Sequence, residues 1–231
     1  MNCAKNLAAS CEVKLIEKKP FLPTSDMIWS AAGLQEGHRL KTLEEAESLL
    51  GRAWQVMADE CRSILGGELH YQAMAYHALR MAGVPLAQVG MNVKQWIAEP
   101  TSELFRQLSL RKPEAYQGGF EPIPDIVLFR PEIEGDWRRR NRDNTLRHML
   151  MAIEVKASER AGGRLSRAEV LRDIQKLSAH RHEVRRLGAD MTPVMMVIDV
   201  APLPSERMRA EDVAICQKTA EAEDVRWLYL G

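Results

Sequence analysis

The chain has 231 residues, of which 45% are hydrophobic, so it is long enough to bury one substantial core. Its 32 basic and 32 acidic side chains cancel, which excludes attraction of an anionic partner by net charge and leaves that role to a local basic patch. There is no apolar run of the roughly 18 residues that span a bilayer, and no apolar signal segment. The four cysteines include no CxxC pair, so we expect a reduced, cytoplasmic protein without a membrane partner.

The predicted elements alternate between helix and strand along the chain. Residues 1–40 carry two prolines and weak periodicity, which predicts an irregular arm ahead of a single α/β domain over residues 41–231. The expected elements are a helix over 43–65, a helix over 68–83, a strand over 86–93, a helix over 102–110, strands over 125–129 and 149–156, a helix over 166–187, a strand over 193–200, a helix over 206–220 and a strand over 225–230.

This order predicts a three-layer α/β/α sandwich around a mixed sheet. The helix that follows Ser166 has the S-x-x-E pattern of a capping box, with Glu169 as its acid. His180 and His182 lie two positions apart on the same helix and therefore point in different directions. We expect solvated histidines there and no zinc site.

The stretch MLMAIEVK, residues 149–156, combines a core-like strand with two charged side chains. Glu154 and Lys156 lie two positions apart and share one face of the strand. Charged groups are costly to bury unless they pair or bind a ligand. The run DIVLF begins with Asp125, and antiparallel pairing with MLMAIEVK would bring its carboxylate beside Glu154 and Lys156. Because two carboxylates repel each other without a cation, the pattern predicts a site for magnesium or manganese.

Pro124-Asp125 and Glu154-Val155-Lys156 resemble the two motifs of the PD-(D/E)xK nuclease superfamily, also called restriction-endonuclease-like. The resemblance covers about residues 65–200, where a helix, an acidic strand, the Glu-x-Lys strand, a helix and a strand follow in the family order. It implies a restriction-endonuclease-like core and an enzyme that uses Mg²⁺, or Mn²⁺ in its place, to hydrolyse phosphodiester bonds of DNA. DNA is the implied partner, while RNA and a homodimer are left open.

The resemblance also implies roles for the motif residues. Asp125 and Glu154 would hold the metal, with the Val155 carbonyl as an additional ligand. Lys156 would orient or help to deprotonate the attacking water and stabilise the charge that develops on the phosphate.

Two neighbouring helices add candidates to this set. Glu68 would bind the metal directly or through water, although the helix dipole also favours any acid in a first turn. The helix after the Glu-x-Lys strand offers Asp173, Gln175 and Lys176. Gln175 is the family-like choice for a catalytic role, and a solvated helix face explains all three nearly as well.

The segment between the two motifs is longer than in the simplest members, with 29 positions from Asp125 to Glu154. An excursion over residues 135–147 would account for this length. Its basic residues are candidate contacts to DNA phosphates, together with Lys176: Arg138, Arg139, Arg140 and Arg142. If this run is only a solvated loop, Lys176, Arg164 and Arg167 are the next candidates.

Two other functions stay open. A catalytically inactive DNA-binding or scaffold protein would keep the same fold without cleaving, although a retired site has no reason to keep Asp125, Glu154 and Lys156 together. In the third alternative, these residues form an unrelated ion-pair cluster in an α/β protein.

Overall fold

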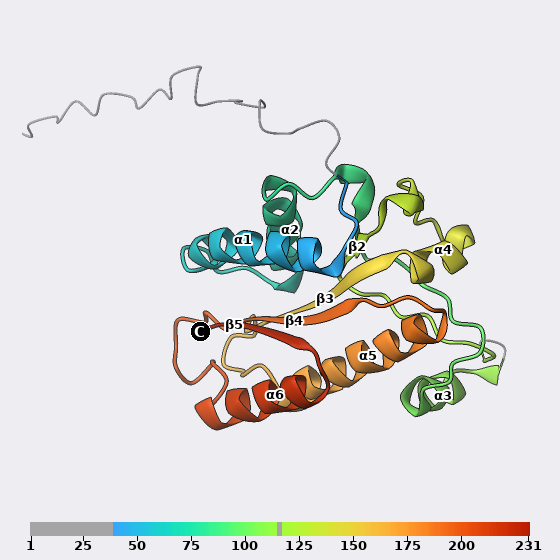
Figure 1. Cartoon of the computed structure of the whole chain (residues 1–231). Coiled ribbons are helices and arrows are strands. Elements are labelled where there is room, and N and C mark those ends of the chain that lie inside the picture. The colour runs from blue at the N-terminus through green and yellow to red at the C-terminus, as the bar shows by residue number, and fades with distance from the viewer. Residues whose placement is uncertain (1–38, 115–116) are drawn as a thin grey trace, which may run out of the picture. The chain divides into compact units, whose positions relative to one another are not determined.

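A computed structural model describes residues 39–114 and 117–231 of the chain. These residues form six α-helices and five strands around one mixed sheet, so the predicted α/β class is confirmed (Figure 1). The predicted irregular arm, residues 1–40, lies outside the described residues except for its last two positions. None of the helices in the described ranges is long and apolar enough to cross a membrane.

The sheet has the strand order β1-β2-β3-β4-β5. Its strands are β1 Val89–Met91, β2 Ile126–Phe129, β3 Met149–Ala157, β4 Thr192–Ile198 and β5 Arg226–Leu230. The first three strands are antiparallel neighbours, and β3, β4 and β5 are parallel neighbours. The predicted antiparallel pairing of DIVLF with MLMAIEVK is confirmed, with Ile126 opposite Ile153. The start of β2 therefore lies beside the middle of β3, and Asp125, one residue earlier in the chain, reaches Val155 in the second half of β3.

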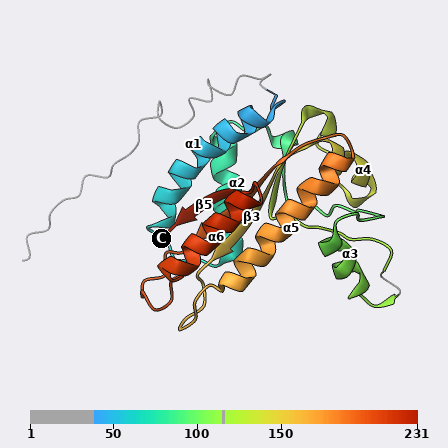
Figure 2. The same ribbon diagram turned by 60° about the horizontal axis from the view of Figure 1, so that its bottom comes forward.

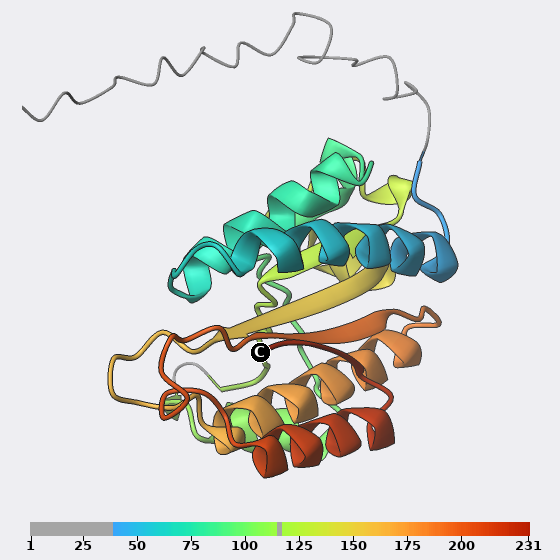
Figure 3. The same cartoon turned by 90° about the vertical axis from the view of Figure 1, so that its left-hand side faces the viewer.

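Helices cover both faces of the sheet. On one face lie α1 (Leu43–Cys61) and α2 (Glu68–Met81), and on the other lie α5 (Arg167–Arg186) and α6 (Ala210–Ala222), as Figure 3 shows. Figure 2 shows α5 and α6 side by side, with α3 beyond α5. The helix α3 is Glu103–Leu110, and α4, Arg142–Arg147, belongs to the predicted excursion between β2 and β3.

The two faces of β3 explain where its charged residues point. Ile153 and Val155 pack in the core between the sheet and the helices α1 and α2, whereas Ala152 belongs to the core on the side of α5. Because side chains alternate along a strand, Glu154 and Lys156 continue the face of Ala152. Both charged side chains therefore point toward the layer of α5.

Some predicted boundaries are wrong, because buried polar contacts set the chain path. The expected strand over 86–93 contains a 3₁₀ turn at Leu86–Gln88, where the Gln88 amide donates to the carbonyl oxygens of Leu40 and Phe129. The helix expected from 206 begins at Ala210, because the Met208 amide donates to the Asp199 carboxylate at 2.8 Å and fixes a turn ahead of it.

The predicted capping box at Ser166 is also wrong. The Ser166 side chain makes no cap hydrogen bond, and the carboxylate of Glu169 lies 3.7 Å from the guanidinium of Arg160 instead. A capping box does form at the start of α1, where Thr42 and Glu45 bond to each other's backbone amides. The acid at the third helical position therefore completes a capping box in α1 and not in α5.

Candidate functional site

Residues from four segments of the chain meet near the end of β3. Asp125 directly precedes β2, Glu154 and Lys156 lie in β3, Glu68 is the first residue of α2, and Asp173 lies in the second turn of α5. Contacts with Lys156 and with the backbone of β3 join these segments. We call Glu68, Asp125, Glu154 and Asp173 the acidic cluster. Three of its members, Glu68, Asp125 and Glu154, and their lysine are candidates that the sequence itself indicates.

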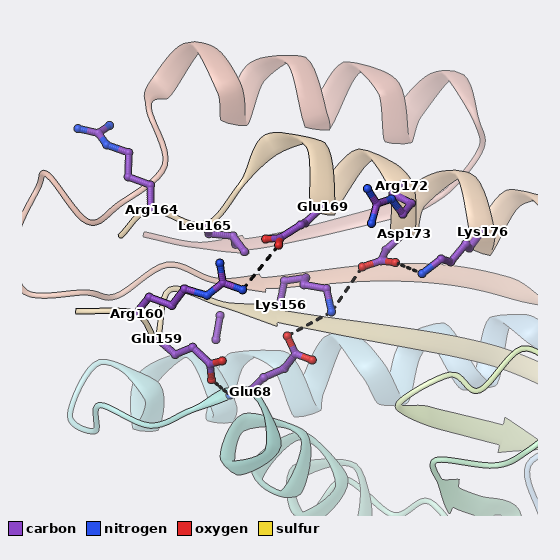
Figure 4. A pocket seen from close by; sticks show the side chains of 11 residues that line it. Glu68, Lys156, Glu159, Arg160, Arg164, Leu165, Glu169, Arg172, Asp173 and Lys176 are labelled. Carbon is purple, nitrogen blue, oxygen red and sulfur yellow. Dashed lines mark hydrogen bonds and ion pairs between the residues drawn. The ribbon is translucent and has the colours of Figure 1, made fainter. Parts of the chain in front are cut away.

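The ammonium of Lys156 pairs with three members of the acidic cluster. Its Nζ is 3.1 Å from Glu68 Oε2, 3.4 Å from Asp173 Oδ2 and 3.7 Å from Glu154 Oε1. Figure 4 shows Glu68 and Asp173 reaching it from opposite sides. Burial lowers the pKa of Lys156, but the surrounding carboxylates raise it further than burial lowers it, so the group is held in its charged form.

Asp125 is fixed to the neighbouring strand by its own carboxylate. The backbone N–H of Val155 donates to Asp125 Oδ2 at 2.7 Å, which crosses from the start of β2 to the end of β3. Burial is the main cause that raises the pKa of Asp125 to about 6, and the bond from Val155 and the charge of Lys156 oppose that rise. Repulsion from Glu68 and Asp173 adds to it.

The pKa of Glu154 is raised further from its usual value than that of Asp125. Burial is the largest cause, followed by repulsion from Asp125 and then from Asp173. Together they raise the pKa of Glu154 to about 8, despite the attraction of Lys156 and Lys176. Carboxyl groups displaced this far by burial and by like charges are typical of functional sites.

The acidic cluster has the donor chemistry of a site for a hard divalent cation. Three of its four carboxylates, those of Glu68, Glu154 and Asp173, make ion pairs, and they do so with only two cations among the described residues, Lys156 and Lys176. Oxygen-only ligands with excess negative charge suit Mg²⁺ or Mn²⁺. As the side chains stand, no group of three or more histidine, cysteine, aspartate or glutamate residues in the described ranges surrounds a metal position. The Lys156 ammonium instead pairs with Glu68 and Asp173. The residues therefore fit a cation in charge and ligand type, with side-chain rotation needed to enclose it.

Glu159, which sequence analysis missed, sets the position of Glu68. The N-cap residue of α2 is Gly67, which has no side chain to accept from the first amides of the helix. The Glu159 carboxylate, just beyond β3, accepts the backbone N–H of Glu68 at 2.7 Å in its place. An acid is favoured at a helix N-terminus, so this bond ties the start of α2 to the end of β3.

Asp173, and not Gln175, is the residue that α5 contributes to the cluster. Gln175 is exposed and faces a different hollow, beside Thr101 and Ser178. Lys176 does join the site, with its Nζ 2.7 Å from Asp173 Oδ1. Helical spacing could have indicated this, because Asp173 lies four residues before the buried Leu177 and so shares its face.

The prediction for His180 is wrong, whereas His182 is exposed as expected. His180 is only 2% exposed because it lies three residues after Leu177 and four before Val184, on the buried face of α5. Its Nε2 has no hydrogen-bond partner among the described residues. Burial lowers the pKa of His180 to about 3, so the imidazole is neutral.

The arginine run, Arg138, Arg139, Arg140 and Arg142, is exposed throughout. Arg138 pairs with Asp136 at 2.6 Å, and Arg139 pairs with Glu121 at 2.7 Å. In the part of the chain that the structure describes, Arg140 and Arg142 make no ion pair. None of the four contacts the acidic cluster, so the structure does not bring this run and the cluster together.

A pocket of about 240 Å³ lies beside Lys156, between the end of β3 and the start of α5 (Figure 4). Its walls include Glu68 and Asp173 of the acidic cluster and three exposed arginines, Arg160, Arg164 and Arg172. We call it the arginine-lined pocket. Arg167, which was another candidate, pairs with Asp212 of α6 at 2.8 Å. Positive side chains around an acidic site offset the repulsion that a polyanion would otherwise meet.

Comparisons of the chain with protein-family models, with curated proteins and with solved structures found no match.

Proposed function

We propose that the protein is a metal-dependent deoxyribonuclease with a restriction-endonuclease-like core. The convergence of Asp125, Glu154 and Lys156 at adjacent strand ends carries this proposal. Burial and mutual repulsion make such a cluster costly to maintain, and a structural role would be served as well by fewer charges. A hard cation and a phosphate diester are the ligands that match an acidic centre bordered by arginines.

Asp125 and Glu154 hold the cation in this proposal, and Glu68 assists. The Val155 carbonyl oxygen already accepts from Lys156 Nζ at 3.2 Å, so it is within reach of the same centre. Mg²⁺ supplies Lewis-acid chemistry there, by activating water and neutralising charge on the phosphate.

The remaining residues bind and orient the substrate. Lys156 orients the attacking water, and its ammonium offsets charge on the phosphate oxygens in the transition state. Asp173 keeps Lys156 in place from the side of α5, at 3.4 Å. The arginine-lined pocket contacts the phosphates that flank the scissile bond.

Cleavage of plasmid and linear DNA over a range of Mg²⁺ concentrations tests the proposal. We expect Mg²⁺-dependent cleavage that stops in EDTA and falls by about 10²-fold or more in Lys156→Ala, a loss typical of a group that assists proton transfer. Lys218→Ala, on the exposed face of α6, is the matched control and should cleave like the parent.

The absence of cleavage at every Mg²⁺ concentration, or equal cleavage by Lys156→Ala and the parent, contradicts the proposal. Binding of DNA without any cleavage would identify the inactive DNA-binding alternative.

A further inference from the structure

A second pocket, also of about 240 Å³, lies on the other side of Asp173 and Lys176. Glu154 forms part of its wall, so it adjoins the acidic cluster directly. Its remaining walls are mostly apolar and come from α3, from the segment before β2 and from α5: Phe105, Phe120, Glu121, Pro122, Ile123, Pro124 and Leu177. We call it the apolar pocket. The arginine-lined pocket and the apolar pocket share Asp173 and Lys176, so they meet at the acidic cluster.

His180 lies in the wall of the apolar pocket and is the feature that needs an explanation. It is almost fully buried, and its Nε2 is sealed from solvent without a partner among the described residues, so a ligand in the pocket reaches this nitrogen only after the ring turns. Buried polar atoms in native proteins are nearly always hydrogen-bonded, and an orphaned one points to a missing ligand or water. A neutral imidazole offers one donor and one acceptor to such a ligand.

The size of the apolar pocket limits what it can hold. Pockets for drug-sized molecules enclose roughly 300–1,000 Å³, so this one suits a single ring system. Enzymes that act on a base or on unpaired DNA hold the base between apolar or aromatic side chains and read its edge by hydrogen bonds. The apolar walls and His180 provide both kinds of contact, next to the carboxylates proposed to act on the phosphate.

We propose that the apolar pocket binds the base of the nucleotide next to the scissile phosphate, with His180 bonding to the base edge. This inference rests on the proposed nuclease function, because that function places the phosphate at the acidic cluster. A base that occupies the pocket cannot be stacked and paired in a duplex. The substrate class is therefore DNA with an unpaired nucleotide at the cleavage position, such as a single strand, a flap or a frayed end.

The test is a titration of the full chain, in Ca²⁺ buffer, with the four deoxynucleoside 5′-monophosphates and with deoxyribose 5-phosphate, which lacks a base. Nuclear magnetic resonance of the Ile123 methyl groups and the His180 ring reports occupancy of the pocket. We expect at least one nucleotide to bind about tenfold or more tightly than the base-free sugar phosphate and to shift both signals.

Three variants localise the effect. His180→Phe keeps a ring of similar size and removes the orphaned nitrogen, so it should fold normally and lose about three- to tenfold in nucleotide affinity. Ile123→Asp places a charge at the rim and should abolish the advantage of the nucleotide over the sugar phosphate. Ile215→Asp is the matched control, because Ile215 is 43% exposed against 42% for Ile123 and lies outside the pocket.

The inference is overturned if all four nucleotides bind no better than deoxyribose 5-phosphate, or if their advantage survives both His180→Phe and Ile123→Asp. The two proposals fail separately. Mg²⁺-dependent cleavage with no preference for unpaired DNA contradicts the proposed base pocket and supports the proposed nuclease function. Nucleotide binding that depends on the base, without any cleavage of DNA, contradicts the proposed nuclease function and supports a base-binding pocket.

Discussion

The acidic cluster and the arginine run place charge in opposite ways. The cluster draws single residues from distant parts of the chain, from Glu68 to Asp173, and holds them together, buried or partly buried, around Lys156. The arginine run draws on neighbours in sequence and leaves them in solvent, where two of them pair with nearby acids. Buried charge is expensive and solvated charge is not. The sparse charges of the cluster therefore indicate function more strongly than the dense charges of the run.

The largest effect should come from removing the central cation. Lys156→Ala leaves the carboxylates facing one another, and loss of a partner from a fully buried ion pair costs roughly 3–5 kcal/mol. The Lys156 side chain is 15% exposed, so we expect a smaller loss of about 2–3 kcal/mol in the free energy of unfolding, measured with urea at pH 8 in EDTA.

Two comparisons sharpen this prediction. Saturating Ca²⁺ should stabilise Lys156→Ala more than the parent, because a bound cation replaces the missing charge. Arg138→Ala removes an exposed cation from the run and should change the free energy of unfolding far less than Lys156→Ala does. Equal losses of unfolding free energy in Lys156→Ala and Arg138→Ala would contradict the distinction between the acidic cluster and the arginine run.

A somewhat smaller effect is expected from the buried histidine of α5. The unfolded chain binds a proton at His180 below about pH 6.5, whereas the folded protein binds it only below about pH 3. Stability is therefore lost as pH falls from about 6.5 toward 3. At about 1.4 kcal/mol per pKa unit, the parent should lose about 2 kcal/mol more than His180→Phe between pH 8 and pH 5.

Urea unfolding of the parent and His180→Phe at both values measures this difference. The other titratable groups around the pocket, Glu121, Glu154, Asp173 and Lys176, are the same in both proteins, so the difference isolates the histidine. Parallel pH profiles would mean that His180 is accessible to protons in the folded state.

The smallest effect concerns the two sets of arginines as contacts for DNA. Each lost phosphate contact lowers the slope of log affinity against log salt concentration by about 0.9 for duplex DNA. We expect the triple change of Arg160, Arg164 and Arg172 to alanine to flatten this slope more than the triple change of Arg138, Arg139 and Arg140. Two members of the second set pair closely with acids of the chain, at 2.6 and 2.7 Å, whereas in the first set Arg160 lies 3.7 Å from Glu169.

Binding in Ca²⁺ buffer at several salt concentrations supplies both slopes. If the triple change in the arginine run flattens the slope more than the triple change of the pocket arginines does, the assignment is reversed and the run is the principal contact with DNA. An unchanged slope in both triple variants would remove both sets from the DNA interface.

The sequence predicts those parts of the site that local pattern controls. Strand periodicity put Glu154 and Lys156 on one face, and the position of Asp125 at the head of an apolar run led to the correct strand pairing. The same reasoning could not give Glu159, because its role depends on a hydrogen bond to Glu68 from a segment 91 residues away in sequence. Contacts of that kind depend on tertiary packing and leave no periodic signal.

The errors on α5 have a different origin. The buried face of this helix includes Asp173 and His180 among apolar residues. A prediction of the buried face that uses only the spacing of hydrophobic residues omits both. Polar residues on an apolar helical face are expected mainly at functional or strained sites. If residues of α5 are assigned to a face by their helical spacing and not by their polarity, Asp173 is chosen over Gln175. The same rule predicts that His180 is buried.

Calorimetric titration of Mg²⁺ and Mn²⁺ into the parent and Asp125→Asn tests the central claim, that the acidic cluster binds the catalytic cation. An asparagine oxygen can still accept from the Val155 amide, so this change removes charge while keeping the bond that fixes the strand ends. Asp136→Asn, beside the arginine run, is the matched control. The account predicts saturable binding in the parent and in Asp136→Asn, and affinity at least about tenfold weaker in Asp125→Asn. Equal affinity in all three proteins, or no binding to the parent, would contradict it.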